Sequence, residues 1–202
     1  MRGLLVALNN TPDGALLLPS GNYDVWDVVP ALPPPPPPPG VPDDTWRRQH
    51  AEHTVFFTNL GMVGMNVGLD TRVIDQIGLA NPLAAHTARL DDGRIGHDKN
   101  LFPDWAVADG PWLKERPWVP AYLDEGWIRQ AQAALECPET VEMLAAIRDP
   151  MTRPRFIGNL NRAWDLTRYR IDRVPEYELA RCGIPGPAPL RPAYTGLPAT
   201  GP

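Results

Sequence analysis

The stretch "TVFFTNLGMVGMNVGLDTRVIDQIGL", residues 54–79, decides the fold of this chain. It begins with β-branched and aromatic residues, which are typical of a buried strand. A connection with glycines at 61, 64 and 68 follows, and a second apolar run then ends at Asp75. We predict a strand–loop–strand unit, in which the glycines provide a positive φ or a close backbone approach in the loop.

Helical patterns dominate the sequence after this unit. Asn81 followed by Pro82 predicts the start of a helix over residues 82–90, and three further helices are predicted over about 124–136, from 138 onward, and over 154–171. The last is the most regular, with an apolar arc of Phe156, Ile157, Leu160, Ala163, Trp164, Thr167 and Ile171. Its opposite side carries Arg155, Asn159, Arg162 and Arg170. We predict an α/β fold, with α+β as the alternative, in which a small sheet from residues 54–98 packs against helices from residues 124–171.

Both ends of the chain are rich in proline. The chain has 26 prolines, and seven of them form the run Pro33–Pro39. Such a run adopts an extended polyproline II conformation, which serves either as a docking site for a partner with an aromatic groove or as a spacer. We predict an irregular segment with a polyproline linker over 1–45, a single globular domain over 46–182, and a disordered tail over 183–202. A short strand or a docking segment is possible within 25–29.

Composition excludes several classes of function. The net charge of −5 disfavours a nucleic-acid partner, because that contact needs a basic surface. The apolar run from Gly3 to Leu8 is too short for a membrane span or a signal-peptide core, so the chain taken by itself is expected to be soluble. The four histidines do not form a zinc-binding pattern, and no metal or cofactor is expected. Cys137 and Cys182 are either a disulfide or two buried thiols.

Five residues are candidates for ligand binding. Asp75, at the end of a predicted strand, either caps the following turn or faces a ligand cleft. Arg94, His97 and Lys99 lie within six residues and either bind a sugar hydroxyl or phosphate or form a solvated loop. Trp112 belongs to a tryptophan-rich region that offers either stacking platforms for sugars or buried structural aromatics. The glycine segment lacks the patterns of nucleotide-binding loops, and the sequence shows no complete set of catalytic residues.

The run "NLGMVGMNVGLDTRVIDQIGLANPLAAHTARLDDGRIGHDKNLFPDW", residues 59–105, resembles a known family. It is similar to the soluble C-terminal, extracytoplasmic domain of the actinobacterial terminal β-(1→2)-arabinofuranosyltransferase family. The resemblance extends over residues 54–182 and is strongest in "VIDQIGLANPLAAH" and "GRIGHDK". The proline-rich part has no counterpart in it, so we expect residues 1–45 to lie outside the family.

The resemblance implies a membrane glycosyltransferase of mycobacterial type. Such an enzyme takes arabinose from decaprenylphosphoryl arabinose and adds terminal arabinofuranose to arabinogalactan and lipoarabinomannan in cell wall biogenesis. Its catalytic aspartate lies near the first membrane helices, which have no counterpart here, so no catalytic residue is assigned. The expected function is that of an accessory domain, inactive alone, at the extracytoplasmic face of the cell membrane. Its partners would be the membrane portion of the transferase and either the arabinan acceptor or the lipid-linked donor. The alternative is a free-standing carbohydrate-binding or protein-interaction module.

Overall fold

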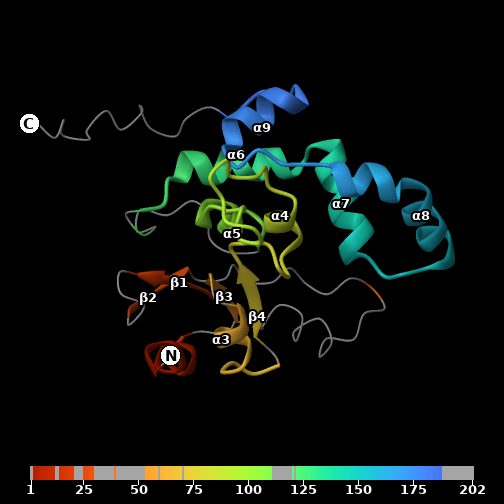
Figure 1. Cartoon of the computed structure of the whole chain (residues 1–202). Helices are drawn as coiled ribbons and strands as arrows, with labels where there is room; N and C mark the ends of the chain where they lie inside the picture. The colour runs from red at the N-terminus through yellow and green to blue at the C-terminus, as the bar shows by residue number, and fades with distance from the viewer. Residues whose placement is uncertain are drawn as a thin grey trace, which may run out of the picture.

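The structure, a computed structural model, describes residues 2–11, 14–20, 25–29, 39, 53–58, 60–69, 71–110, 120 and 122–187 (Figure 1). Our predictions for residues 33–38, for Trp112 and for the tail after residue 187 lie outside these residues. Within the described ranges, no helix is both long and apolar enough to cross a membrane.

A mixed sheet of four strands forms one half of the molecule. Its strands are β1 (Leu16–Ser20), β2 (Val25–Val29), β3 (Thr54–Phe57) and β4 (Arg72–Asp75), in the spatial order β2-β1-β3-β4. β1 pairs with β2 as an antiparallel neighbour, and β1, β3 and β4 run parallel to one another. The two strands predicted in the 54–79 stretch are confirmed. The sheet nevertheless differs from the predicted one, because β1 and β2 come from the segment expected to be irregular, where a short strand at 25–29 was one alternative. Among the described residues, no strand follows β4.

Alternating side chains pack both faces of the sheet. α1 (Arg2–Asn10) and α3 (Leu60–Gly64) cover one face, and α5 (Pro103–Ala108) and α6 (Glu125–Leu135) cover the other (Figure 1). The first interface contains Leu4, Leu17, Val55, Phe57 and Val63. The second contains Leu16, Leu18, Val29, Phe56, Ile74, Ala106, Val107, Leu123 and Ile128. The apolar positions of "LLL" are thus divided between two cores, which is why this short run becomes a buried strand.

The glycine-spaced connection is not the loop that we predicted. Residues 60–64 form the short helix α3, whose Val63 packs under the sheet, and none of the three glycines at 61, 64 and 68 has a positive φ. The glycine that the fold requires comes later, at Gly78, where φ is 79° and a Cβ atom would lie 2.5 Å from the backbone nitrogen of Ala85. Backbone freedom is therefore needed after β4 and not between β3 and β4.

The helix predicted over residues 82–90 is shorter than expected. α4 covers Pro82–Ala85, and Asn81 caps it by accepting a hydrogen bond from the backbone N–H of Leu83. Beyond His86 the chain becomes extended, because Thr87 forms a parallel bridge with Ile171. Pairing with a distant segment thus replaces the continuation of the helix.

The three C-terminal helices occur where the sequence predicts them. α6 begins after Asp124, whose carboxylate accepts the N–H of Trp127, and it is followed by α7 (Pro138–Arg148) and α8 (Arg153–Arg168). A further helix, α9 (Pro175–Cys182), packs on α6. Together with the mixed sheet these helices confirm the predicted α/β-type fold.

Candidate functional site

A crevice opens in the sheet between β1 and β3. The two strands pair only at Leu16 with Thr54 and at Leu17 with Val55. Beyond these positions β1 remains paired with β2, and β3 remains paired with β4, so the two central strands separate. Pro19 lies in the separated part of β1 and has no N–H to donate to a neighbour. The register of the strands therefore creates the crevice.

The crevice lies at the carboxyl ends of the three parallel strands. Its volume is about 280 Å³, close to the lower end of the range of about 300–1,000 Å³ that is usual for ligand pockets. The residues that line it are Leu18, Pro19, Phe56, Phe57, Thr58, Gln76, Pro103 and Tyr122. In sheets of parallel strands, ligands bind at this end, where neighbouring connections diverge. This crevice is our candidate functional site.

Three polar side chains surround the mostly apolar wall. Gln76 donates a hydrogen bond from Nε2 to Oδ1 of Asn100, which leaves its own carbonyl oxygen as an acceptor. The Tyr122 hydroxyl donates to Oδ2 of Asp27 at 3.2 Å. Thr58 is exposed at the end of β3 and provides a hydroxyl. Together these groups offer donors and acceptors of the kind that bind hydroxyl groups.

The electrostatic surroundings of the crevice are neutral to acidic. Asp104, next to Pro103, is buried and accepts the backbone N–H of Asp124 at 3.1 Å. Burial raises the pKa of Asp104 to about 6, against a smaller opposing effect of that N–H. Burial also raises the pKa of Tyr122, and the charge of Asp27 adds to this. None of the described lining residues carries a positive charge.

Asp75 is a structural cap. Its side chain is fully buried, and it accepts the backbone N–H groups of Leu79 at 2.7 Å, Ala80 at 2.7 Å and Asn81 at 2.9 Å. Of the two interpretations of this residue, the structure shows the capping one. Asp75 holds the turn from β4 to α4 and so fixes the position of its neighbour Gln76 in the crevice.

The charged candidates lie in a separate loop. Arg94 and His97 form an isolated antiparallel bridge, in which the His97 N–H donates to the Arg94 carbonyl at 2.7 Å, and both side chains are exposed. Lys99 is half-buried near His86, where burial is the main cause of a lowered His86 pKa and the charges of Arg170 and Lys99 contribute. None of the three lines the crevice.

Sequence reasoning missed the polar residues of the crevice. Thr58 and Gln76 each directly follow a parallel strand of the observed sheet, and the ends of the two predicted strands were the available signal. Asp27 and Tyr122 are far from both in sequence, and only the folded sheet brings them to the same crevice. The aromatic region that suggested Trp112 does contribute a structural residue, since Trp105 is buried and donates from Nε1 to the Arg173 carbonyl at 2.8 Å.

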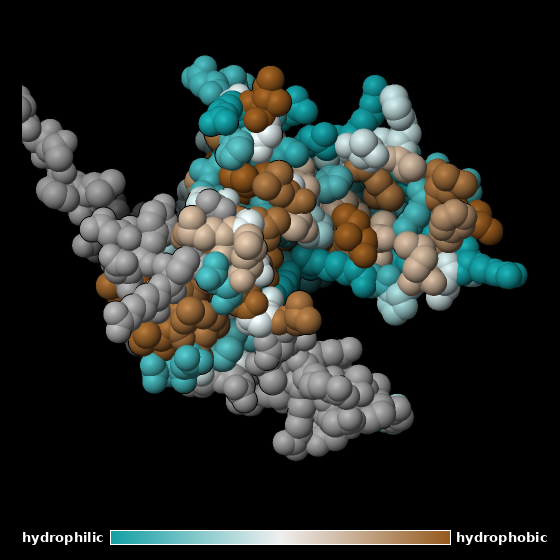
Figure 2. All heavy atoms as spheres, turned by 60° about the horizontal axis from the view of Figure 1, so that its bottom comes forward, coloured by the Kyte–Doolittle hydropathy of each residue, from teal (hydrophilic) through white to brown (hydrophobic). Residues whose placement is uncertain are grey.

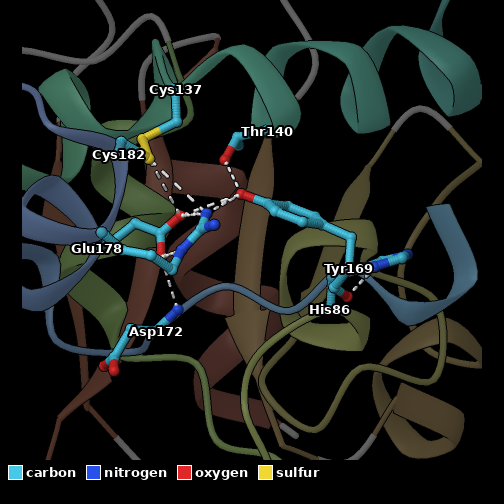
Figure 3. A network of polar contacts seen from close by, with 8 residues as sticks. His86, Cys137, Thr140, Tyr169, Asp172, Glu178 and Cys182 are labelled. Carbon is cyan, nitrogen blue, oxygen red and sulfur yellow. Dashed lines mark hydrogen bonds and ion pairs between the residues drawn. A yellow bond between two sulfur atoms is a disulfide. The ribbon is translucent and has the colours of Figure 1, made fainter. Parts of the chain in front are cut away.

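A second polar cluster joins the C-terminal helices (Figure 3). The buried carboxylate of Glu178 accepts two hydrogen bonds from Arg181, one from the Tyr169 hydroxyl at 3.1 Å and one from the Asp172 N–H at 2.9 Å. The Tyr169 hydroxyl also lies 2.7 Å from the hydroxyl of Thr140 at the start of α7. Every polar atom of this carboxylate has a partner, so we interpret the cluster as structural.

The disulfide between Cys137 and Cys182 lies beside this cluster (Figure 3). It decides between the two alternatives that the sequence left open. The two sulfurs and the Glu178 carboxylate lie within 4.8 Å of one another, an arrangement that could otherwise hold a metal ion. Because the sulfurs are bonded to each other, they are not thiolate ligands here. The disulfide instead ties the end of α9 to the residue that directly precedes α7.

Fold and crevice together define an α/β domain with a ligand-sized opening at the carboxyl ends of its parallel strands. Residues 40–175 match the model of the AftB family C-terminal domain, and the chain belongs to this family. It is 59% identical to a terminal beta-(1->2)-arabinofuranosyltransferase of Mycobacterium tuberculosis, over 94% of this chain and 30% of that protein. It is 44% identical to a protein of the same description from Corynebacterium glutamicum, over 54% of this chain and 16% of that protein. No solved structure matches the chain.

These matches confirm the predicted family and correct its predicted extent. The chain spans about 30% of the length of the M. tuberculosis relative. Because that match includes 94% of the chain, it leaves too little uncovered for residues 1–45 to lie outside the family. This result agrees with the structure, in which β1 and β2 complete the sheet.

Proposed function

We propose that this chain is an accessory domain of a lipid-linked-sugar-dependent arabinofuranosyltransferase that acts in the synthesis of cell-wall arabinan. The description of its two relatives supports the reaction. The chain matches only 30% of the length of the M. tuberculosis relative, which favours an accessory role. The catalytic residues belong, in this proposal, to the membrane portion of the transferase. The domain works at the extracytoplasmic face of the cell membrane, where an oxidising environment would maintain the Cys137–Cys182 disulfide.

The domain's contribution, we propose, is to bind the arabinan acceptor in the crevice between β1 and β3. The observation on which this depends is the chemistry of the lining, which combines aromatic and aliphatic walls with Gln76, Thr58 and the Tyr122–Asp27 pair. Such a mixture suits the apolar faces and hydroxyl groups of a neutral sugar. The phosphate of decaprenylphosphoryl arabinose would instead need cations or several N–H donors. The acceptor therefore fits this crevice better than the donor.

Arg94, His97 and Lys99 remain proposed ligand contacts of a different kind. They lie in an exposed loop outside the crevice, where Arg94 and Lys99 bring positive charge. If they contact a ligand, its chemistry should be anionic, as in the donor phosphate. Alanine substitution of Arg94 or His97 in a full-length transferase would then weaken transfer without lowering the amount of protein.

Isothermal titration of the chain with arabinan oligosaccharides tests the proposed acceptor site. Tyr122→Ala should weaken binding at least about tenfold, since it removes an aromatic wall together with the hydroxyl that pairs with Asp27. Tyr177→Ala on α9 is the matched control, because this tyrosine is also exposed but lies outside the crevice. Equal affinities for wild type and Tyr122→Ala, with both proteins folded, would refute the proposal.

A second candidate is a free-standing arabinan-binding module, because the described crevice is formed within this chain alone. Transfer assays separate the two functions. With lipid-linked arabinose as donor, the chain by itself should give no product. In a full-length transferase, Tyr122→Ala should lower the rate at limiting acceptor. An unchanged rate, combined with arabinan binding by the isolated chain, would favour the free-standing module.

A further inference from the structure

The apolar side of α8 faces away from the protein core, whereas an ordinary surface helix turns its apolar side toward the core. None of its 16 residues is buried. Four large apolar side chains of its predicted apolar arc are more than half exposed: Phe156 58%, Ile157 57%, Leu160 65% and Trp164 67%. They lie at spacings of one, three and four residues, which places them on one side of the helix. Apolar side chains gather accordingly at the α7–α8 end of the molecule (Figure 2).

The polar side of α8 contacts the protein, and Leu166 on the same side is partly buried against the core of the C-terminal helices. Arg155 donates to the Ala145 carbonyl at 2.8 Å and to the Asp149 carboxylate at 2.5 Å. Asn159 donates to the Ala146 carbonyl at 2.8 Å, and Arg162 forms an ion pair with Glu142 of α7. These contacts fix the rotation of the helix. The apolar side is therefore turned outward by specific hydrogen bonds to α7 and not by chance.

Positive charge surrounds the apolar side. Residues 153–170 contain five arginines and one aspartate in a chain whose net charge is −5, and of these arginines Arg155 and Arg162 are offset by Asp149 and Glu142. At 100° per residue, Arg153 falls within the apolar arc and Arg168 at its edge. The Arg168 guanidinium lies over the Trp164 ring, 4.3 Å from its centroid. A cation held against an interfacial tryptophan gives this face both apolar and anion-attracting character.

We propose that α8 is an interfacial helix that lies in the surface of a membrane containing anionic lipids. Low overall hydrophobicity, aromatic and aliphatic residues on one side, and arginines around them are the features of such helices. The helix would lie in the membrane plane, with Phe156, Ile157, Leu160 and Trp164 among the acyl chains and the arginines at the lipid phosphates. This inference does not depend on the proposed acceptor site, and it adds a membrane contact to the described part of the chain.

Charge complementarity favours this occupant over a second copy of the chain. Two α8 faces brought together would place Arg153 and Arg168 of each copy near the same residues of the other, with one aspartate per helix to offset four arginines. An anionic lipid surface attracts the same arginines, and the contact should weaken as salt screens it. Because the chain as a whole is acidic, its binding to an anionic surface requires this local basic patch.

Sedimentation of the 202-residue chain with vesicles tests the proposal. Wild type should bind vesicles of phosphatidylcholine mixed with phosphatidylglycerol and bind pure phosphatidylcholine vesicles weakly. The double change Ile157→Ser with Leu160→Ser should lower the partition coefficient at least about tenfold. The matched control is Met65→Ser with Leu69→Ser, which removes two exposed apolar side chains after α3 and should leave binding unchanged.

The arginines are tested separately. Arg153→Ala with Arg168→Ala should remove the preference for phosphatidylglycerol, whereas Arg89→Ala, at an exposed arginine after α4, should not. Equal losses in the two serine variants would show non-specific adsorption and overturn the proposal. Absence of wild-type binding to either vesicle would also overturn it and would leave the remainder of the transferase as the cover of this face. All five proteins should keep the same melting temperature within about 2 °C, because the altered residues are exposed.

Discussion

α6 and α8 are both amphipathic, but they use their two sides in opposite ways. α6 buries Ile128, Ala131 and Ala134 between the sheet and the other helices. α8 buries none of its residues and instead docks on α7 through Arg155, Asn159 and Arg162. The comparison teaches that a periodic apolar arc identifies a face of a helix without identifying what covers it. Where the chain's own core covers the face, the arc stabilises the fold. Where nothing in the described chain covers it, the arc is available for a partner.

Truncating one apolar residue in each helix should give the largest difference in the free energy of unfolding between α6 and α8. Ile128→Ala should lower the free energy of unfolding by about 2–5 kcal/mol, because it leaves a cavity between the sheet and α6. Leu160→Ala on α8 should change it by no more than about 0.5 kcal/mol, since that side chain is exposed. Urea denaturation of both variants measures the difference. A loss above 1–2 kcal/mol for Leu160→Ala would mean that the apolar side of α8 is covered after all.

The disulfide concerns α6 and not α8. Cys137 lies two residues after the end of α6, and its bond to Cys182 closes a separation of 45 residues and holds α9 against α6. Cys137→Ser with Cys182→Ser should therefore cost about 2–4 kcal/mol, mainly because the unfolded chain becomes less constrained. Reduction of wild type should produce a similar loss and have no effect on the variant. Hydrogen exchange should speed up in α6 and α9 more than in α8; a uniform increase, or one confined to α8, would contradict this assignment.

Asp104 offers a pH-dependent probe of the start of α6. Its carboxylate accepts the N–H of Asp124, the residue that caps α6. Burial raises its pKa from 3.8 to about 6, so the folded protein holds this proton more tightly than the unfolded chain. Between about pH 4 and pH 6 this group therefore lowers the free energy of unfolding as pH rises, by up to roughly 3 kcal/mol. Above about pH 6 the whole of this loss in the free energy of unfolding is present, because Asp104 is ionised in both the folded and the unfolded protein.

Asp104→Asn should remove this contribution, because the amide keeps an oxygen for the Asp124 N–H and has no proton to lose. The free energy of unfolding of the variant minus that of wild type should be lowest near pH 4 and should rise to a plateau above pH 6. Asp92→Asn, in an exposed turn, provides the control and should give a flat difference. A flat difference for Asp104→Asn as well would show that Asp104 is ionised in the folded protein throughout this range.

The same contrast explains how far the sequence could predict the structure. Local signals were sufficient for the existence of the strands that the structure has at 54–57 and 72–75, for the helix start at Asn81, and for the positions of the three helices over 125–168. They failed where distant pairing decides the outcome. β1 contains Pro19 and lies between turn signals, so only its pairing with β2 and β3 makes it a central strand.

The candidate site shows the same division. Its ligand-facing residues Thr58 and Gln76 follow from the rule that ligands bind at the carboxyl ends of parallel strands, but the crevice itself depends on where β1 and β3 separate. That point is a property of the register between residues 38 positions apart, Leu16 and Thr54, and no local pattern encodes it. The inverted orientation of α8 is likewise decided by α7, whose carbonyls and carboxylates accept bonds from arginine and asparagine.

The smallest predicted effect concerns those bonds. Arg155→Ala should cost about 1 kcal/mol, because it removes charge-assisted hydrogen bonds to Ala145 and Asp149 that are partly exposed to solvent. Arg168→Ala should cost about half of that or less, since Arg168 contacts only the exposed Trp164 ring among the interactions described for it. Hydrogen exchange of the α8 amides is the sharper measurement. With few apolar contacts to retain it, α8 should open locally in Arg155→Ala while α6 stays protected. If Arg168→Ala opened α8 more than Arg155→Ala, the helix would be held by its apolar side, and the contrast with α6 would disappear.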